Sequence, residues 1–436
     1  MNGTVTGANN IAMGCKAAIN LSSGAGNIAL GQLAMGSGVV TGSYNIAFGK
    51  ESGKAITSGA NNILLGKCAG VAIAQGQNHI MIGLDAGRAS TGASYSNVYL
   101  GIYAGECGTD ASFNFYGSVS AGRCQKTGCY NIAVGNNALK GSSTVNNNTA
   151  ANNVALGQGA GWCISSGADN VALGQQAMGG AVATGNNNLA IGKNAGKNIA
   201  SGGYNSIFGE SAGCSLTGGT GHVILGNSAG KYVTNTTYNT FVGSNTGLCN
   251  TGAINVAMGY MSLKGSSTTT NNTGGCNVAI GQYAGRDVTS GSLNALVGHY
   301  AGCGVTSGAC NVFLGMYAGD NVTTGHRNIA IGYNVALPSA TADDQFAIGC
   351  NASCWISGDS SFTVCLANST AIKAVNSGGI FCATCFKGDG GALTNINAGF
   401  DPDAQENLYA GTNAGAASDA DTEYNVAIGY DAGRKL

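Results

Sequence analysis

The chain has 436 residues, of which 75 are glycine and only 2 are proline, and its formal net charge is −1. Charged residues make up 8% of the sequence, against about 25% in typical globular proteins. The few Lys and Arg residues are scattered, whereas a nucleic-acid-binding surface needs clustered cations. No apolar run approaches the roughly 18 residues of a membrane-spanning helix. We therefore expect neither nucleic-acid binding nor membrane insertion.

One short phrase recurs from end to end of the chain: Asn, three apolar residues and Gly. It first appears at residues 10–14 and occurs twenty-two times, with a usual step of 17 residues. A fixed period of this length is typical of a solenoid, in which equivalent units stack, and not of a globule with an active-site cleft. Three apolar residues bracketed by Gly are too few for a helix, so each phrase predicts a short β-strand.

Both faces of each predicted strand are apolar. We number each rung from the Gly that ends the phrase, which is position 0. Positions −1 and −2 are apolar throughout and position −3 is mostly Ile or Val. Neighbouring side chains in a strand point to opposite faces, so positions −1 and −3 share one face and position −2 lies on the other. A strand that is apolar on both faces needs a core on each side. We expect one face to fill a coil and a partner chain to cover position −2.

Position −4 is Asn in eighteen of the twenty-two copies, and His79, Phe113, His222 and Gln345 occupy the others. Stacked Asn side chains can hydrogen-bond along parallel strands, and Asn tolerates the left-handed backbone that a corner requires. Gly at position 0 permits a turn in which a Cβ atom would clash. The predicted structural ladder is Asn10, Asn27, Asn45, Asn62, Asn131, Asn153, Asn170, Asn188, Asn255, Asn277, Asn311 and Asn328. The predicted rung-turn glycines are Gly14, Gly31, Gly49, Gly66, Gly157, Gly174, Gly192, Gly281, Gly315 and Gly332.

A second phrase, Gly-x-x-Ala-Gly, follows the first, as at residues 66–70, and Thr or Ser recurs at position −8. The two phrases predict two short strands and two Gly turns in each rung. Two longer rungs share the sequence Leu-Lys-Gly-Ser-Ser-Thr, at residues 139–144 and 263–268. These inserts are either tolerated loops or binding loops on one face of the solenoid.

The repeat divides the chain into three predicted segments. Residues 1–352 are a β-roll shaft of about 17-residue rungs, residues 353–403 an irregular β connector, and residues 404–436 resumed β-roll rungs. No capping element is recognisable before Leu436, so we expect further chain beyond it. The predicted fold class is all-β: a parallel β-solenoid, either an intertwined or a side-by-side homotrimer.

The phrases at residues 328–334 and 425–433 resemble the repeats of phage tail-fibre proteins and the head repeats of trimeric autotransporter adhesins. Residues 386–397 resemble the Gly-Asp-Gly-x-x-Leu-Thr-Asn segment of tail-fibre shafts. The resemblance covers nearly the whole chain. It implies a homotrimer of parallel β-rolls that attaches a virion or a cell to a surface, without catalysis. The implied partners are copies of the chain itself, other virion or surface-fibre components, and a host-surface glycan or protein receptor.

Autotransporter heads have a shorter repeat, and the sequence shows neither a signal peptide nor a membrane anchor. We therefore favour a virion tail fibre, with a bacterial surface adhesin as the alternative. A monomeric ice- or surface-binding solenoid would instead present its recurring Thr and Ser as one flat face. A glycan-cleaving β-helix would need paired carboxylates in a groove, and acidic residues are scarce within the rungs.

Few residues could carry chemistry. The cysteines around the end of the repeat contain one Cys-x-x-Cys pair and no second one, so they support a zinc site only weakly. These residues are Cys350, Cys354, Cys365, Cys382 and Cys385. Cys107 and Cys124 share one position on successive rungs, which leaves a rung-to-rung disulfide open. His79 and His222 lie in the Asn ladder and have no catalytic partners. We predict no enzyme, no catalytic residue, no metal site and no cofactor.

Overall fold

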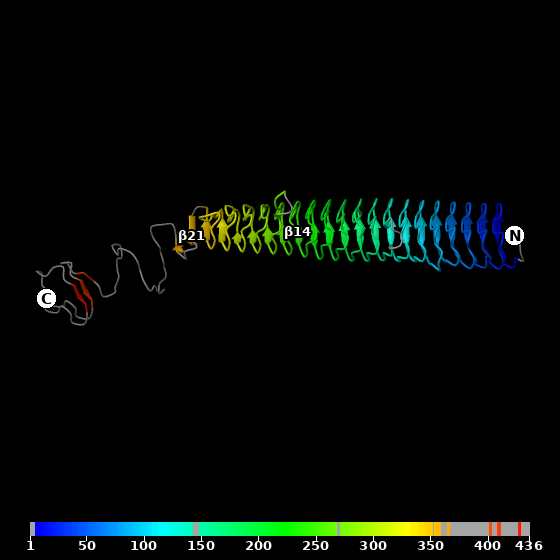
Figure 1. Cartoon of the computed structure of the whole chain (residues 1–436), viewed down its shortest axis with the longest axis horizontal. Coiled ribbons are helices and arrows are strands. Elements are labelled where there is room, and N and C mark those ends of the chain that lie inside the picture. The colour runs from blue at the N-terminus through cyan, green and yellow to red at the C-terminus, as the bar shows by residue number, and fades with distance from the viewer. Residues whose placement is uncertain are drawn as a thin grey trace. The chain divides into compact units, whose positions relative to one another are not determined.

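The computed structural model describes residues 5–142, 148–267, 271–351 and 353–358, and the backbone of four short strands that follow. The predicted fold class is confirmed: the chain forms a parallel β-solenoid of about 17-residue rungs, and the described residues contain no α-helix (Figure 1).

Each rung of the solenoid contributes one short strand. The first ten are β1 (Ile11–Met13), β2 (Ile28–Leu30), β3 (Ile46–Phe48), β4 (Ile63–Leu65), β5 (Ile80–Ile82), β6 (Val98–Leu100), β7 (Phe115–Gly117), β8 (Ile132–Val134), β9 (Val154–Leu156) and β10 (Val171–Leu173). The next ten are β11 (Leu189–Ile191), β12 (Ser206–Phe208), β13 (Val223–Leu225), β14 (Thr240–Val242), β15 (Val256–Met258), β16 (Val278–Ile280), β17 (Ala295–Val297), β18 (Val312–Leu314), β19 (Ile329–Tyr333) and β20 (Phe346–Cys350).

These strands pair in chain order, in parallel and in register, so that equivalent residues of successive rungs lie directly above one another. Ala12 pairs with Ala29, for example, and Ala29 with Ala47. At about 4.8 Å between neighbouring strands, twenty rungs extend roughly 90 Å. The prediction of two strands per rung is wrong for the described rungs, because outside the named strands they contain only isolated bridges such as Leu21 with Val40.

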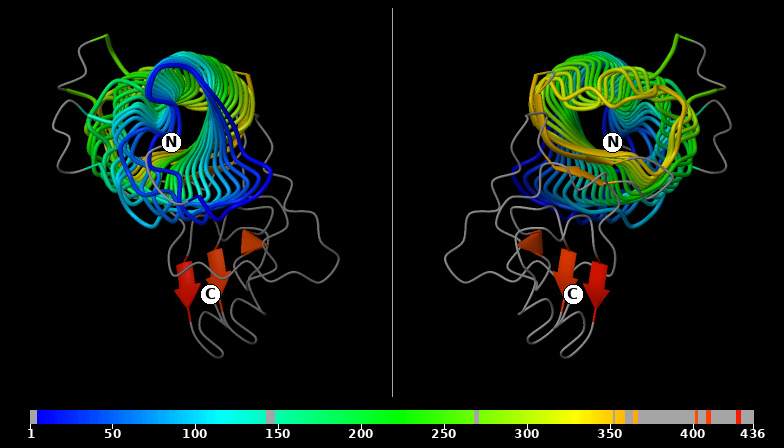
Figure 2. Two further views of the ribbon diagram at one scale, coloured as in Figure 1. Left: turned by 90° about the vertical axis from the view of Figure 1, so that its right-hand side faces the viewer. Right: turned by 90° about the vertical axis from the view of Figure 1, so that its left-hand side faces the viewer.

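Three columns of side chains fill the interior of the coil. From the second rung on, position −2 is fully buried whether it is small, as in Ala29, or large, as in Phe241. Position +3 is buried and is Ala in most rungs, and position +7 is a buried aliphatic residue such as Ile73 in many of them. Figure 2 shows the coil closing around this interior. The expectation that position −2 meets a partner is therefore wrong: it forms the core, and positions −1 and −3 point outward.

One rung departs from the predicted register. Phe115 pairs with Val98 and Tyr116 with Tyr99, so Asn114 and not Phe113 occupies position −4. Ser118 takes the place of the turn glycine, with a φ of 131°. The phrase was misaligned because a glycine, Gly117, lies one residue before the turn.

The turn glycines are required by stacking as well as by backbone conformation. Gly66 has a φ of +135°, and a Cβ atom on it would lie 2.5 Å from the carbonyl oxygen of Gly83 in the next rung. A Cβ atom on Gly83 would lie at the same distance from the carbonyl oxygen of Gly101. Because each turn rests on the turn of the next rung, these glycine positions have no room for a side chain, and Ser118 is the exception among the described turns.

The parallel stack ends after β20. Strand β21 (Ser353–Gly358) pairs antiparallel with β20, and β22 (Val364–Leu366) pairs antiparallel with β21. A separate compact unit spans residues 373–436. In it, β24 (Leu408–Ala410) pairs antiparallel with β23 (Asp401–Pro402) and parallel with β25 (Val426–Ile428). Cys382, Cys385 and most of the predicted connector lie outside the described residues.

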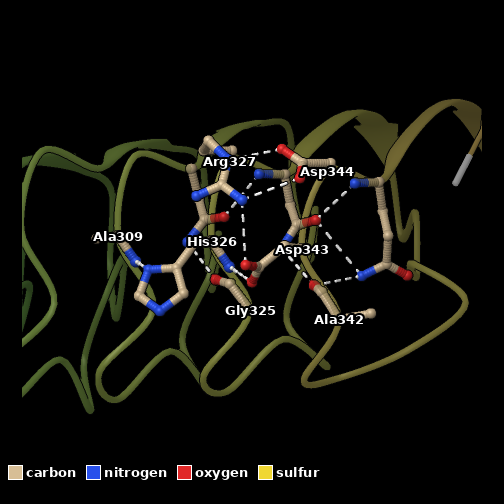
Figure 3. Close-up of polar contacts among 10 residues, drawn as sticks. Ala309, Gly325, His326, Arg327, Ala342, Asp343 and Asp344 are labelled. Atoms are coloured by element: carbon tan, nitrogen blue, oxygen red, sulfur yellow. Dashed lines mark hydrogen bonds and ion pairs between the residues drawn. The ribbon is translucent and has the colours of Figure 1, made fainter. Parts of the chain in front are cut away.

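Charged side chains link the rungs near the end of the stack (Figure 3). The Arg327 guanidinium donates from Nε to Asp344 Oδ1 at 2.6 Å and holds the pKa of that carboxyl below its ordinary value. Asp343 Oδ1 accepts the backbone N–H of His326 at 2.8 Å, and His326 Nδ1 accepts the N–H of Ala309 at 3.1 Å. Side-chain acceptors thus connect three successive rungs along one corner.

We predict that Gly66→Ala destabilises the solenoid, because the added methyl group meets a backbone oxygen and the backbone conformation disfavours any side chain. The cost should be at least about 1 kcal/mol, measured as a lower urea midpoint. Gly117→Ala is the matched control, because its Cβ would lie in ordinary contact, 3.4 Å from the Phe115 ring. Equal urea midpoints for the two variants would contradict the stacking requirement.

Candidate functional site

The Asn ladder runs along the inside of one corner, and a member within the stack, such as Asn188, links three rungs. The backbone N–H and the Nδ2 of Asn188 both donate to Asn170 Oδ1, at 3.0 Å each. Asn188 Nδ2 also donates to the Gly202 carbonyl at 2.9 Å, and Asn188 Oδ1 accepts from Asn205. The predicted ladder residues from Asn27 to Asn328 are buried, and Asn10 in the first rung is partly buried. The ladder is therefore an internal, structural feature.

The left-handed corner residue is not the ladder Asn but the residue before it. Asn187, at position −5, has a φ of 58°, and Tyr44 and Tyr204 occupy the same position in other rungs with φ of 61° and 57°. The expectation that the ladder Asn supplies the left-handed corner is therefore wrong. Position −4 instead serves the stack through its side chain, since each buried Asn amide there both donates and accepts hydrogen bonds.

His79 and His222 replace Asn in the ladder and keep its backbone bond to the preceding Asn, its bond to a carbonyl of the next rung and its acceptor role. His79 Nδ1 accepts the backbone N–H of Asn97 at 3.2 Å, and its Nε2 lies 3.0 Å from the Ser94 carbonyl. This pattern requires a neutral ring with its proton on Nε2. Burial lowers the pKa of His79 to about 4 and also lowers the pKa of His222.

One exposed feature is the face made by positions −1 and −3 of β1–β20, which we call the outward sheet face. Its side chains are Ile, Val, Leu, Met, Phe or Ala in all but three places, where Gly117, Ser206 and Thr240 occur. None is charged. Leu156 and Met258 are each about two-fifths exposed. Strand length and rung spacing give the face roughly 900 Å². Apolar patches of more than a few hundred Å² on monomers mark interaction sites.

A second exposed feature borders this face at position −5, which we call the corner column. Left-handed backbone favours Gly or Asn, yet several rungs place a bulky side chain there. Tyr44, Tyr130, Tyr204, Tyr238 and Leu293 are between 60% and 69% exposed. Local backbone preference does not explain these residues, so the corner column is a candidate contact surface for a ligand.

Tyrosines also stack along position +2. The rings of Tyr283 and Tyr300 lie 4.6 Å apart and those of Tyr300 and Tyr317 5.1 Å apart, both stacked. Neighbouring rings cover much of one another's faces, so this ladder chiefly stabilises the stack and is a poor platform for a ligand.

The part of the chain that the structure describes contains no metal-ligand cluster, no disulfide and no membrane-spanning helix. No group of three or more His, Cys, Asp or Glu residues there could hold a metal ion. Cysteines of the described rungs are free thiols, Cys107 and Cys124 among them. Within the same residues, no helix is long and apolar enough to cross a membrane.

No protein-family model matches the sequence, and no curated protein matches it.

We predict that Asn188→Ala destabilises the surrounding rungs by roughly 2–4 kcal/mol, because it leaves buried backbone and amide groups without partners. Asn188→His should restore most of this loss, as His79 and His222 show for the same position. The exposed Asn187→Gly variant is the control and should be neutral or stabilising. Hydrogen exchange of the neighbouring amides measures all three, and an unchanged exchange rate in Asn188→Ala would contradict the ladder's role.

We predict that lowering the pH from 7 to 4 destabilises the solenoid through its buried histidines. The pKa of His79 is about 4 in the folded chain, against an ordinary value of 6.5. Between pH 6.5 and pH 4, His79 is protonated in the unfolded chain but stays neutral in the folded chain. The free energy of unfolding therefore falls as the pH falls. The loss should reach up to about 3 kcal/mol for His79 and level off below pH 4. In His79→Asn/His222→Asn, urea unfolding should show most of this loss removed; an unchanged pH dependence would contradict it.

Proposed function

We propose that the chain is the shaft of an attachment fibre, of the phage tail-fibre kind, in which three copies of the solenoid pack side by side through their outward sheet faces. The observation that carries the proposal is the uncharged, apolar outward sheet face that runs along all twenty parallel strands. Water exposure of such a face is costly, and a covering surface of matching length relieves that cost.

A second copy of the chain is the partner that fits this face best. The face repeats at every rung, and a parallel copy has the same rung spacing. Rotation about an axis along the rod places equivalent rungs at the same height, so that no rung is left uncovered. Each described rung pairs with the next rung of its own chain, which favours the side-by-side over the intertwined form. The number three comes from the resemblance to trimeric fibres.

Attachment needs a stiff rod and an exposed surface for the receptor. The ladder of hydrogen bonds and the packed interior supply stiffness, and the corner column supplies exposed aromatic side chains that suit a surface glycan or protein. The alternative of a flat hydroxyl face is less well supported. The Thr41 and Thr184 hydroxyls donate to carbonyls of the next rung, at 3.4 Å each, so these side chains serve the stack.

Charges placed on the outward sheet face test the proposal. In the variant Leu156→Lys/Leu173→Lys/Ile191→Lys, association should weaken at least tenfold, because three lysines per chain would be buried near the axis. The control Gln158→Lys/Gln175→Lys/Asn227→Lys adds the same charge at exposed turn positions and should keep the wild-type mass. Light scattering across a range of concentrations measures both. Equal masses for the two variants, or a wild-type monomer, would overturn the proposed packing.

A further inference from the structure

Cys107 and Cys124 lie on successive rungs in strict register. Each follows its strand by the same number of residues, and Leu100 at the end of β6 pairs with Gly117 at the end of β7. The backbone N–H of Cys107 donates to the Arg123 carbonyl at 2.8 Å, which fixes the two cysteines side by side. Both side chains are partly exposed.

The spacing of the two residues suits a disulfide bond. Neighbouring parallel strands lie about 4.8 Å apart, and disulfides join residues whose Cα atoms are about 4.4–6.8 Å apart. The two thiols already contact each other through a hydrogen bond. Bond formation therefore needs only a side-chain rotation and no shift of the rungs.

Charged neighbours make the two thiols unequal. The hydrogen bond from Cys107, with the nearby Arg123 and Lys140, lowers the pKa of Cys124 to about 6, against the opposing effects of burial and Glu106. The same hydrogen bond and burial raise the pKa of Cys107. Of the two thiols, Cys124 is the one whose pKa is lowered, and the thiolate is the form that attacks disulfides.

We propose that Cys107 and Cys124 form a reactive dithiol that small-molecule disulfides, such as glutathione disulfide, convert into a covalent link between two rungs. The Cys124 thiolate attacks one sulfur of glutathione disulfide, forms a mixed disulfide and releases one glutathione thiolate. Cys107 then loses its proton to solvent and attacks Cys124 Sγ, which releases the second glutathione. Two protein thiols are oxidised, and one glutathione disulfide is reduced to two glutathione molecules. The inference rests on the stacking of the two cysteines and on their charged neighbours, and it does not depend on the proposed function.

The chain contains its own control pair. Cys276 and Cys310 are both exposed and both lie in the corner column. Leu293 of the intervening rung separates them, since its N–H donates to Gly275 and the N–H of Cys310 donates to Ser292. Two rung spacings of about 4.8 Å exceed the reach of a disulfide. These thiols should accept glutathione but should not link to each other.

Glutathione disulfide treatment of the full chain tests the proposal. Free thiols are blocked with N-ethylmaleimide, and the chain is unfolded and digested with trypsin without reduction. Residues 89–123 contain Cys107 as their only cysteine, and residues 124–126 contain Cys124. We expect these two peptides to be joined and the peptides of residues 265–286 and 287–327 to stay separate. Persistent glutathione on both Cys107 and Cys124, or joining of the control peptides to the same extent, would overturn the proposal.

Single variants test which thiol attacks. In Cys107→Ser, Cys124 should be trapped as the glutathione adduct. In Cys124→Ser, the remaining Cys107 should react at least tenfold more slowly at pH 7. Intact-mass measurements over time give both rates. A Cys107 that reacts as fast as or faster than Cys124 would overturn the assignment of the attacking thiolate.

Discussion

The structure depends on one constraint: successive rungs stack in register, so that each residue rests on its counterpart about 4.8 Å away. The recurring residues of the sequence each satisfy this stacking constraint at a particular position of the rung. The turn glycines leave room for the carbonyl oxygen above them, as Gly66 does for Gly83. The ladder amides turn the same spacing into a chain of buried hydrogen bonds, as between Asn170 and Asn188. A change at one rung is therefore felt by the rungs above and below it.

Stacking also decides what the surface presents. Any property of one rung repeats along the rod, so an apolar side chain at positions −1 and −3 becomes an apolar face as long as the solenoid. The same repetition builds the corner column and places Cys107 against Cys124. The proposed assembly and the proposed thiol chemistry both follow from the fold in this sense, because a feature of one residue acquires a matching neighbour in the next rung.

Much of this architecture can be predicted from the repeat. The period gives the rungs, and the bracketing Asn and Gly give the strands and the ladder. The choice of inner face could not be predicted, because alternation separates two apolar faces without saying which is enclosed. The size of the residue at position −2 is a clue to the enclosed face. It varies from Ala29 to Tyr99, and inside a closed coil a large side chain in one column can be accommodated by smaller side chains in the other columns. The sequence pattern places Phe113 and not Asn114 at position −4, because Gly117 lies one residue before the turn and is mistaken for the turn glycine. The left-handed corner was misassigned because Tyr and Leu there contradict backbone preference.

Oxidation of two methionines tests most directly whether the outward sheet face is covered by another copy of the chain. In the single chain, Met258 on this face is 41% exposed and Met316 at a turn is 38% exposed. The intact protein is treated briefly with hydrogen peroxide, and sulfoxide at each residue is measured by mass spectrometry. If the faces pack together, Met258 is protected and Met316 is oxidised. Equal oxidation of the two methionines would contradict the packing of the shaft.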